Sequence, residues 1–216
     1  MSQKKLIADY WTQNAPYKEC CNKEIARRTL EPSVPTLIDK YFHKNDKVLE
    51  VGCGLGYDTS YMRSKGINVT AIDLSPANAK IAGGICMDAE NLWFKDGFFD
   101  KVFSFGVLHH TPNTQKAVNE IHRVLKVGGE AVIMIYHKGY AYWYLMATWQ
   151  GMNDYDHTPL SKMYSKSEAI KLFNCFSKVD LTVMPFEGNK RVAKFFYRHP
   201  KLCKMFGSFL VIHATK

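Results

Sequence analysis

"VLEVGCGLGYDTS", residues 48–60, joins an apolar run to a loop with three glycines and then to polar residues that can open a helix. Gly52, Gly54 and Gly56 stand at every second position of the loop. In open α/β sheets, ligands bind beyond the carboxyl ends of the strands. Glycines there permit tight turns and close backbone approach, and the N–H groups that open the next helix attract anions. The stretch therefore predicts a ligand site.

The glycine spacing argues against two common nucleotide sites. The dinucleotide fingerprint is G-x-G-x-x-G/A, and counting from Gly52 and Gly54 places Tyr57 at its third position. A tyrosine there would crowd a pyrophosphate, which disfavours a nicotinamide oxidoreductase. A P-loop is excluded because no Gly-Lys-Ser/Thr follows. A compact G-x-G-x-G loop suits a smaller anion, such as an amino-acid carboxylate.

Short apolar segments alternate with helical patterns on both sides of this loop. Strands are predicted at 47–52, 68–73, 84–89, 99–106, 130–137, 177–185 and 207–215. Helices are predicted at 57–66, at 75–82, from Asn113 to a stop at Gly128-Gly129, and from the capping box that Ser165 opens. Residues 31–35, EPSVP, interrupt one or two short helices nearer the start. This alternation predicts an α/β domain with a largely parallel sheet.

Composition limits the classes to which the chain can belong. It has 216 residues, 46% of them hydrophobic, which fits one domain with a sizeable core. No apolar run approaches the roughly 18 residues of a transmembrane segment. The polar start, MSQKKLIADYWTQ, lacks the apolar segment of a signal peptide. The six cysteines form no CxxC pair, and no metal site is expected. These features predict a cytoplasmic protein.

The net charge of +9 allows an anionic partner, such as nucleic acid, phospholipid or an acidic metabolite. Much of the excess lies late in the chain, at Lys190, Arg191, Lys194, Arg198, Lys201 and Lys204. A solvated basic helix face is the preferred interpretation of this stretch.

Five segments, in order, resemble the motifs of class I S-adenosylmethionine-dependent methyltransferases. They are LEVGCGLG (49–56), AIDLS (71–75), CMDAENL (86–92), FDKVFSFGVLHHTPN (99–113) and LKVGGEAVIMI (125–135). The whole chain is similar to the small type 11 methyltransferases, many of which act on metabolites, quinones, lipids or sugars. The resemblance implies a Rossmann-like, doubly wound, largely parallel seven-stranded sheet with an antiparallel final strand. It implies S-adenosyl-L-methionine as cofactor and S-adenosyl-L-homocysteine as product.

The resemblance also implies roles for individual residues. Asp73 would bind the ribose hydroxyls, Asp88 would accept from the adenine amino group, and the Ala89 N–H would meet a ring nitrogen. The expected cofactor-binding set is Glu50, Gly52, Cys53, Gly54, Gly56, Asp73, Leu74, Asp88, Ala89 and Val107, together with a lid that carries Tyr10, Trp11 and Tyr17. The lid is expected because the reactive sulfonium must be shielded from water, and aromatic ring faces attract cations.

Two histidines, His109 and His110, follow the fourth predicted strand, in the loop that faces the transferred methyl in this family. Either could act as a general base at neutral pH. His110 is favoured, because adjacent side chains diverge and His109 continues the packing direction of Leu108. The alternatives are that both are structural or that no base is used.

Substrate specificity is assigned to the aromatic insertion after the fifth predicted strand. Its candidate substrate-binding residues are Tyr136, His137, Tyr140, Trp143 and Tyr144. They could wall a pocket for an aromatic, apolar or anionic acceptor, or form a dimer contact or a membrane-facing helix. The loop GVLH lacks the Asn/Asp-Pro-Pro-aromatic motif of amide and adenine-amino methyltransferases, and it has no Pro-Cys pair for cytosine.

The predicted organisation is a single methyltransferase domain over 1–216. It divides into a lid or helical segment (1–44), a cofactor-binding core (45–136), a substrate insertion (137–166) and a C-terminal helix with strands (167–216). The predicted function is methyl transfer to a small-molecule acceptor by a monomer or homodimer, with the O-, N-, S- or C-nucleophile left open. Nucleic acid is not the expected partner. Two alternatives stay open: a methyltransferase that acts on RNA or another macromolecule through the basic stretch, and a non-catalytic module that binds S-adenosylmethionine.

Overall fold

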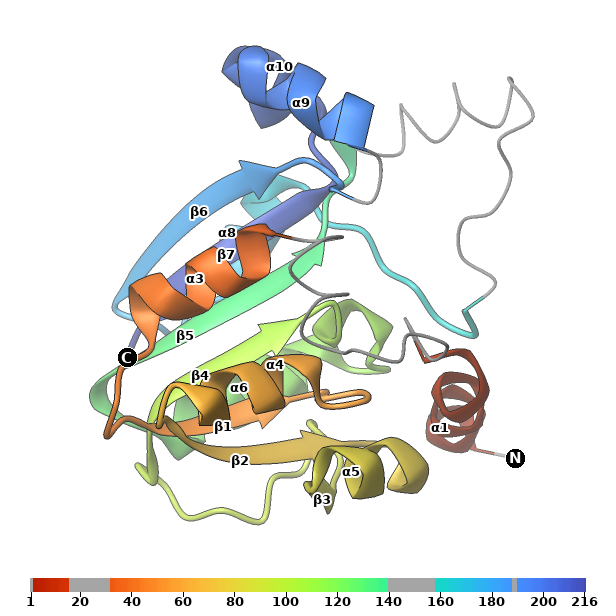
Figure 1. Ribbon diagram of the computed structural model, residues 1–216, viewed down its shortest axis with the longest axis vertical. Helices are drawn as coiled ribbons and strands as arrows, with labels where there is room; N and C mark the ends of the chain where they lie inside the picture. The colour runs from red at the N-terminus through yellow and green to blue at the C-terminus, as the bar shows by residue number, and fades with distance from the viewer. Residues whose placement is uncertain (1, 16–31, 140–157, 188–189) are drawn as a thin grey trace.

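A seven-stranded sheet, in the order β3-β2-β1-β4-β5-β7-β6, organises the computed structural model of this protein (Figure 1). The structure describes residues 2–15, 32–139, 158–187 and 190–216. The strands are β1 (Lys47–Val51), β2 (Asn68–Asp73), β3 (Ile85–Cys86), β4 (Phe99–Phe105), β5 (Leu125–Tyr136), β6 (Lys178–Met184) and β7 (Phe209–Thr215). β7 runs antiparallel to both of its neighbours, and the other pairings are parallel. The predicted fold class is confirmed.

Helices cover both faces of the sheet, and each face has its own apolar core. The helices are α1 (Gln3–Asn14), α3 (Ser33–Tyr41), α4 (Tyr57–Ser64), α5 (Pro76–Ala82), α6 (Thr114–Val124), α8 (Lys166–Leu172), α9 (Lys190–Arg198) and α10 (Pro200–Phe206), with a 3-10 turn at Leu108–His110. Strand residues alternate between the faces: Val48 packs with α3 and α4, whereas Leu49 and Val51 pack on the side of α6 and α8. The doubly wound arrangement follows from this alternation.

The helix predicted from Asn113 begins as expected and ends earlier than expected. The Asn113 side chain caps the N–H of Lys116, and α6 stops at Val124. β5 begins at Leu125, which pairs with Phe99 across an irregular register. The prediction that Gly128-Gly129 ends the helix is therefore wrong: both glycines lie inside β5. Val124 is the last buried apolar residue of α6, and Leu125, the first residue of β5, is buried as well.

The segment EPSVP also behaves differently from the prediction. Pro32 is the N-cap of α3, and Pro35 lies in its first turn. Proline is tolerated there because the first N–H groups of a helix have no partner within the helix. Over the residues described, these prolines begin a helix rather than interrupt one.

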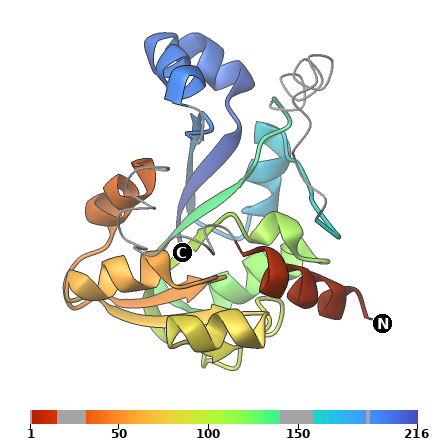
Figure 2. The ribbon, with the colours of Figure 1, turned by 45° about the vertical axis from the view of Figure 1, so that its right-hand side comes forward.

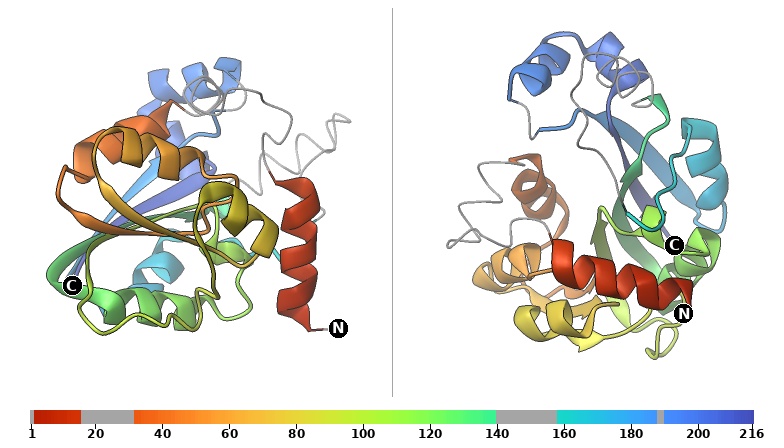
Figure 3. Two further views of the ribbon diagram at one scale, coloured as in Figure 1. Left: turned by 60° about the horizontal axis from the view of Figure 1, so that its bottom comes forward. Right: turned by 90° about the vertical axis from the view of Figure 1, so that its right-hand side faces the viewer.

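β6 and β7 are joined through α9 and α10, which stand at one end of the molecule, apart from the helices that cover the sheet (Figures 1 and 2). α1 lies at the side of the sheet, beside the carboxyl ends of the central strands (Figure 3). No described helix is both long and apolar enough to cross a membrane.

Candidate functional site

A pocket of about 330 Å³ opens at the carboxyl ends of the central strands. The glycine loop after β1, the end of β2, the loop after β4 and the helix α1 all contribute to it. Lining residues that bear on its chemistry are Lys4, Trp11, Gly52, Cys53, Gly54, Tyr57, Asp73, Leu74, Asp88, Ala89, Val107, His110, Tyr136, Phe186 and Phe209. The pocket lies where ligands bind in open α/β sheets.

The three glycines of the loop are needed for three different reasons. All have positive φ: 77° at Gly52, 51° at Gly54 and 81° at Gly56. A Cβ on Gly52 would lie 2.2 Å from a methyl of Val107, and one on Gly56 would lie 2.8 Å from the Cα of Ala82. A Cβ on Gly54 would meet no atom within 4 Å. Gly52 therefore lets the loop pack against Val107, in the loop after β4, and Gly54 keeps the pocket open.

Gly56 does not line the pocket, although it was expected to bind cofactor. It is the N-cap of α4 and lets this helix pack closely on α5. The close-packing role that a dinucleotide fingerprint gives to its third glycine belongs here to Gly56. Tyr57, the first residue of α4, is buried and faces the pocket instead.

Asp73 ends β2, and its carboxylate lies in the pocket wall. Its two oxygens accept hydrogen bonds from the Gly54 N–H and the Ser75 N–H, each at 2.8 Å. Burial raises the pKa of Asp73, and the two backbone bonds oppose that rise. A carboxylate has about four acceptor sites, so each oxygen keeps one for a ligand hydroxyl. The carboxylate thus organises the loop and can also bind a diol.

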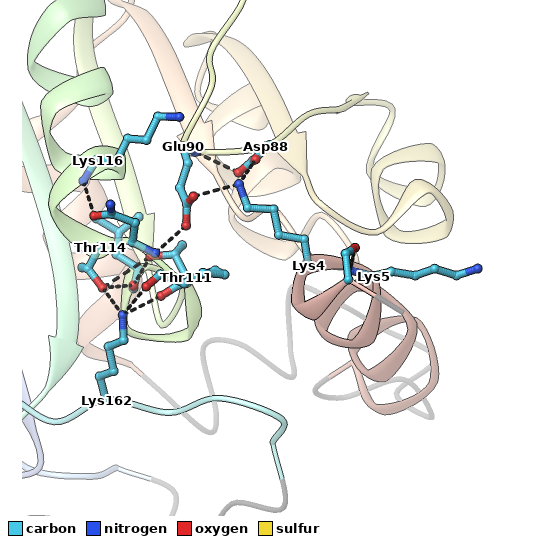
Figure 4. Close-up of polar contacts among 12 residues, drawn as sticks. Lys4, Lys5, Asp88, Glu90, Thr111, Thr114, Lys116 and Lys162 are labelled. Carbon is cyan, nitrogen blue, oxygen red and sulfur yellow. Dashed lines mark hydrogen bonds and ion pairs between the residues drawn. The ribbon is translucent and has the colours of Figure 1, made fainter.

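Asp88 lies at the edge of the pocket, in contact with α1 (Figure 4). Lys4 Nζ is 2.6 Å from Asp88 Oδ2 and 2.7 Å from an oxygen of Glu90. The other Glu90 oxygen accepts from the Asn113 N–H at 2.6 Å. α1 is thereby tied to the segment after β3 and, through Glu90, to the loop after β4. Lys4 and Glu90 carried no recognisable signal in the sequence.

The remaining residues of the expected cofactor set divide into two groups. Cys53, Leu74, Ala89 and Val107 line the pocket. Glu50 does not: it is buried within β1 and accepts a short hydrogen bond from the Thr59 hydroxyl of α4. Burial raises the pKa of the Cys53 thiol, so this cysteine stays protonated and offers no thiolate nucleophile.

Trp11 is a residue of α1 that lines the pocket and contacts residues on two other segments. Its carbonyl accepts from the Asn78 side chain at 3.2 Å, and its ring meets the ring of His110 edge-on at 5.0 Å. Tyr10 packs against Trp11 and does not line the pocket. Tyr17 lies outside the described residues. The predicted lid thus contributes Trp11 to the pocket from its described part.

The structure separates the two histidines. His110 lines the pocket, and its Nδ1 is 2.7 Å from the carbonyl oxygen of Leu160. His109 is fully buried and stacks on Tyr136 with ring centroids 3.7 Å apart. Neither His109 ring nitrogen has a hydrogen-bond partner among the described residues. Burial holds the pKa of His109 well below its usual value, so the ring stays neutral.

Lys162 holds the loop after β4 from the side opposite Glu90 (Figure 4). Its Nζ donates to the carbonyl oxygens of Thr111 at 2.9 Å and Pro112 at 2.7 Å, and its N–H donates to the carbonyl of His109 at 3.0 Å. No sequence pattern pointed to Lys162, because its partners are some 50 positions away and follow no local pattern.

Aromatic side chains wall the part of the pocket beyond His110. Tyr136 is at the end of β5, Phe186 follows β6, and Phe209 begins β7. His137, which was expected to bind substrate, points elsewhere: its Nδ1 lies 2.8 Å from the Gly207 carbonyl, and it does not line the pocket. Tyr140, Trp143 and Tyr144 lie outside the described residues. Phe186 and Phe209 take part in the wall although neither lies in the predicted insertion.

The pocket combines two chemical environments, one polar and one aromatic. One end offers backbone N–H groups and the carboxylates of Asp73 and Asp88. The other end offers aromatic surface and one imidazole, that of His110. Such a site can bind a polar, hydroxyl-rich molecule beside an apolar one and hold a base between them.

A family model described as "Methyltransferase domain" matches residues 49–133. The chain is 36% identical over 105 residues to a tocopherol O-methyltransferase of Arabidopsis thaliana, across 42% of this chain and 30% of that protein. Matched segments span between 24% and 50% of the length of the curated relatives. The comparison therefore bears on the residues around the glycine loop more than on the rest of the chain.

Solved structures resemble the chain over most of its length. A possible histamine N-methyltransferase of Thermotoga maritima aligns with a TM-score of 0.68 and 17% identity, over 98% of this chain and 99% of that one. The [4+2]-cyclase SpnF aligns with a TM-score of 0.62 and 18% identity, over 85% of this chain and 80% of that one. At such identities the likeness concerns the fold, which supports more than one reaction.

Proposed function

Because this chain belongs to the class I S-adenosylmethionine-dependent methyltransferase family, we propose that it transfers a methyl group to a small acceptor with an apolar or aromatic body. The observation that carries the proposal is the division of one pocket into a polar end at Asp73, which ends β2, and an aromatic end at Tyr136, which ends β5 on the other side of β1 and β4, with His110 on its wall. Cofactor and acceptor would lie in these two ends.

The polar end fits S-adenosylmethionine. The open space at Gly54 would admit the methionine part, whose carboxylate would meet N–H groups at the start of α4. The vacant acceptor sites of Asp73 would take the ribose hydroxyls, and Asp88 with the Ala89 N–H would hold the adenine. When bound, this cofactor supplies an electrophilic methyl on a sulfonium.

His110 is proposed as the general base. The carbonyl of Leu160 can only accept, so Nδ1 carries the hydrogen of the neutral ring and Nε2 carries the lone pair. Nε2 would take the proton of an acceptor hydroxyl or amine as the nucleophile bonds to the methyl. Trp11 and Tyr136, in ring contact with His110, would exclude water from the reacting groups.

The cofactor part of the proposal is tested by calorimetry with S-adenosylhomocysteine on the wild type and the Asp73→Ala variant. Loss of charged hydrogen bonds should weaken binding by about 1.5–3 kcal/mol, roughly 10- to 150-fold. Asp180→Ala, which removes an exposed carboxylate from β6, is the control and should bind normally. A change below about twofold for Asp73→Ala would place the ribose elsewhere.

Methyl transfer itself must be measured, since a [4+2]-cyclase shares the fold. We expect transfer of labelled methyl to a phenol, an aromatic amine or another small apolar acceptor, and none to RNA. Transfer to RNA in place of small acceptors would favour a macromolecular substrate. Tight cofactor binding without transfer to any acceptor would favour a non-catalytic module.

A further inference from the structure

The connection between β6 and β7 forms a surface that the pocket does not explain. α9 and α10 follow one another there and project from the end of the sheet (Figures 1 and 2). The stretch from Lys190 to Phe206 contains no Asp or Glu. Its cationic residues are all exposed: Lys190, Arg191, Lys194, Arg198, Lys201 and Lys204.

Apolar side chains are exposed among these cations. Phe195 is 42% exposed and Met205 is 59% exposed, and Leu202 and Tyr197 also face solvent in part. Exposed large apolar residues are ordinary when they occur singly. Here they are concentrated on two short helices that also carry six of the 29 Lys and Arg residues of the chain and no acidic residue.

Helical geometry places cations and apolar side chains on the same outer faces. In α9 the buried residues are Ala193 and Phe196, and at 3.6 residues per turn the opposite side carries Arg191, Phe195 and Arg198. In α10 the buried residue is Cys203. The side opposite it carries Lys201, Lys204 and Met205. Each helix therefore presents a large apolar side chain flanked by positive charges.

We propose that the outer face of α9 and α10 docks on an anionic lipid surface. Clustered Lys and Arg side chains are attracted to anionic headgroups, and apolar side chains exposed among them are stabilised when they leave water for the interface. Phe195 and Met205 would enter the headgroup region while the surrounding cations meet phosphates. The absence of acidic residues in this stretch removes repulsion from the membrane.

Nucleic acid fits this surface less well than lipid. RNA would be bound by the same cations through its phosphates, and aromatic rings can stack on bases. Met205 and Leu202, however, offer neither charge nor a ring, and they contribute only where apolar surface is available. A bilayer satisfies both kinds of side chain, whereas RNA satisfies one.

The location gives such docking a consequence for the pocket. Phe186 precedes α9 and Phe209 follows α10, and both line the aromatic end of the pocket. A protein docked through α9 and α10 would hold this wall close to the lipid. An apolar acceptor could then reach the pocket with a short path through water.

Sedimentation of the full chain with vesicles tests the proposal. We expect binding to phosphatidylcholine vesicles that contain phosphatidylglycerol, little binding to phosphatidylcholine alone, and weakening as salt rises. Because each cation contributes roughly fivefold near an anionic membrane, Lys194→Gln/Lys201→Gln should weaken binding about 25-fold. The control Lys80→Gln/Lys171→Gln removes two exposed lysines from α5 and α8 and should leave binding unchanged.

A second pair of variants tests the apolar contribution. Phe195→Ala/Met205→Ala should weaken vesicle binding about tenfold, by loss of inserted apolar area. Ile81→Ala/Ile170→Ala, which truncates side chains of comparable exposure, 55% and 52%, on other helices, should not. Equal effects from the test and control pairs would contradict a localised docking face.

Three further results would overturn the proposal. The first is equal binding to neutral and anionic vesicles. The second is tight binding of an RNA oligonucleotide at protein concentrations that leave anionic vesicles unbound. The third is a dimer, by light scattering without lipid, that Phe195→Ala/Met205→Ala converts to a monomer while vesicles bind neither form. None of these measurements depends on methyl transfer, so they stand apart from the test of the proposed function.

Discussion

The two ends of the pocket are built in different ways. At the polar end, Gly54 bonds to Asp73 only 19 positions away, and Asp73 bonds to Ser75 only 2 positions away. At the aromatic end, His110 bonds to Leu160 over 50 positions, and Lys162 reaches Thr111 over 51. One end is a local motif of a strand, a turn and a helix. The other is assembled from segments that meet only in the folded chain.

This difference indicates how each end responds to change. A local loop has one sterically defined geometry, so one substitution within it can fill the space that the ligand needs. An end assembled from distant segments is held by several separate hydrogen bonds. The loss of one of them should make the positions of the side chains in this end less well defined, while the fold persists.

The largest effect is expected at Gly54. Gly54→Val would place a branched side chain at positive φ in the space that the pocket keeps open, and we expect no measurable binding of S-adenosylmethionine by calorimetry. Gly128→Val is the matched control, because Gly128 also has positive φ and open space around its Cβ but lies outside the pocket. Normal binding by a folded Gly54→Val protein would refute the role of the loop.

His110 comes next. His110→Ala should lower turnover by about 10²- to 10⁴-fold, the usual contribution of a general base, with cofactor affinity unchanged. The low-pH limb of the pH–rate profile should vanish as well, since the remaining rate would no longer need a neutral imidazole. Near-normal turnover with an unshifted profile would mean that catalysis rests on positioning alone.

His109, in contrast to His110, is expected to have a structural role, and the pH dependence of stability tests this. Its pKa is depressed in the folded protein by burial, whereas the unfolded chain takes up a proton near pH 6.5. Below that pH the unfolded state binds more protons, so stability falls as pH falls. His109→Phe should remove about 1.4 kcal/mol of this loss per pH unit below 6.5. Urea unfolding of both proteins at pH 5 and pH 7.5 measures the difference; an equal pH dependence in both would contradict a buried, neutral ring.

The smallest effect is expected at Lys4, which ties α1 to Asp88 and Glu90. Its side chain is 37% exposed, and exposed ion pairs contribute about 0.2–1 kcal/mol. Lys4→Met should therefore raise the dissociation rate of S-adenosylhomocysteine by no more than about fivefold in stopped-flow measurements. Lys5→Met, one residue along α1, is the control. A much larger effect of Lys4→Met would mean that the Lys4 ion pairs are part of the cofactor-binding site itself.

The same difference explains what the sequence could and could not predict. Strand ends, the glycine loop, Asp73 and the capping residue Ser165 follow local rules, and the fold class was predictable from them. The preference for His110 over His109 agrees with their placement, since only His110 lines the pocket. The placements of Glu50, Gly56 and His137 outside the lining depend on tertiary packing. Lys162, Phe186 and Phe209 lie far along the chain from the residues they join, so no pattern in the sequence could identify them.

A crystal structure with S-adenosylhomocysteine bound would test the assignment of the two ends of the pocket. We expect both ribose hydroxyls within hydrogen-bonding distance of the Asp73 carboxylate, the amino-acid part beside Gly54, and the sulfur directed toward His110 and Tyr136. An adenosine bound away from Asp73, or a sulfur that faces away from the aromatic end, would contradict the division of this pocket between cofactor and acceptor.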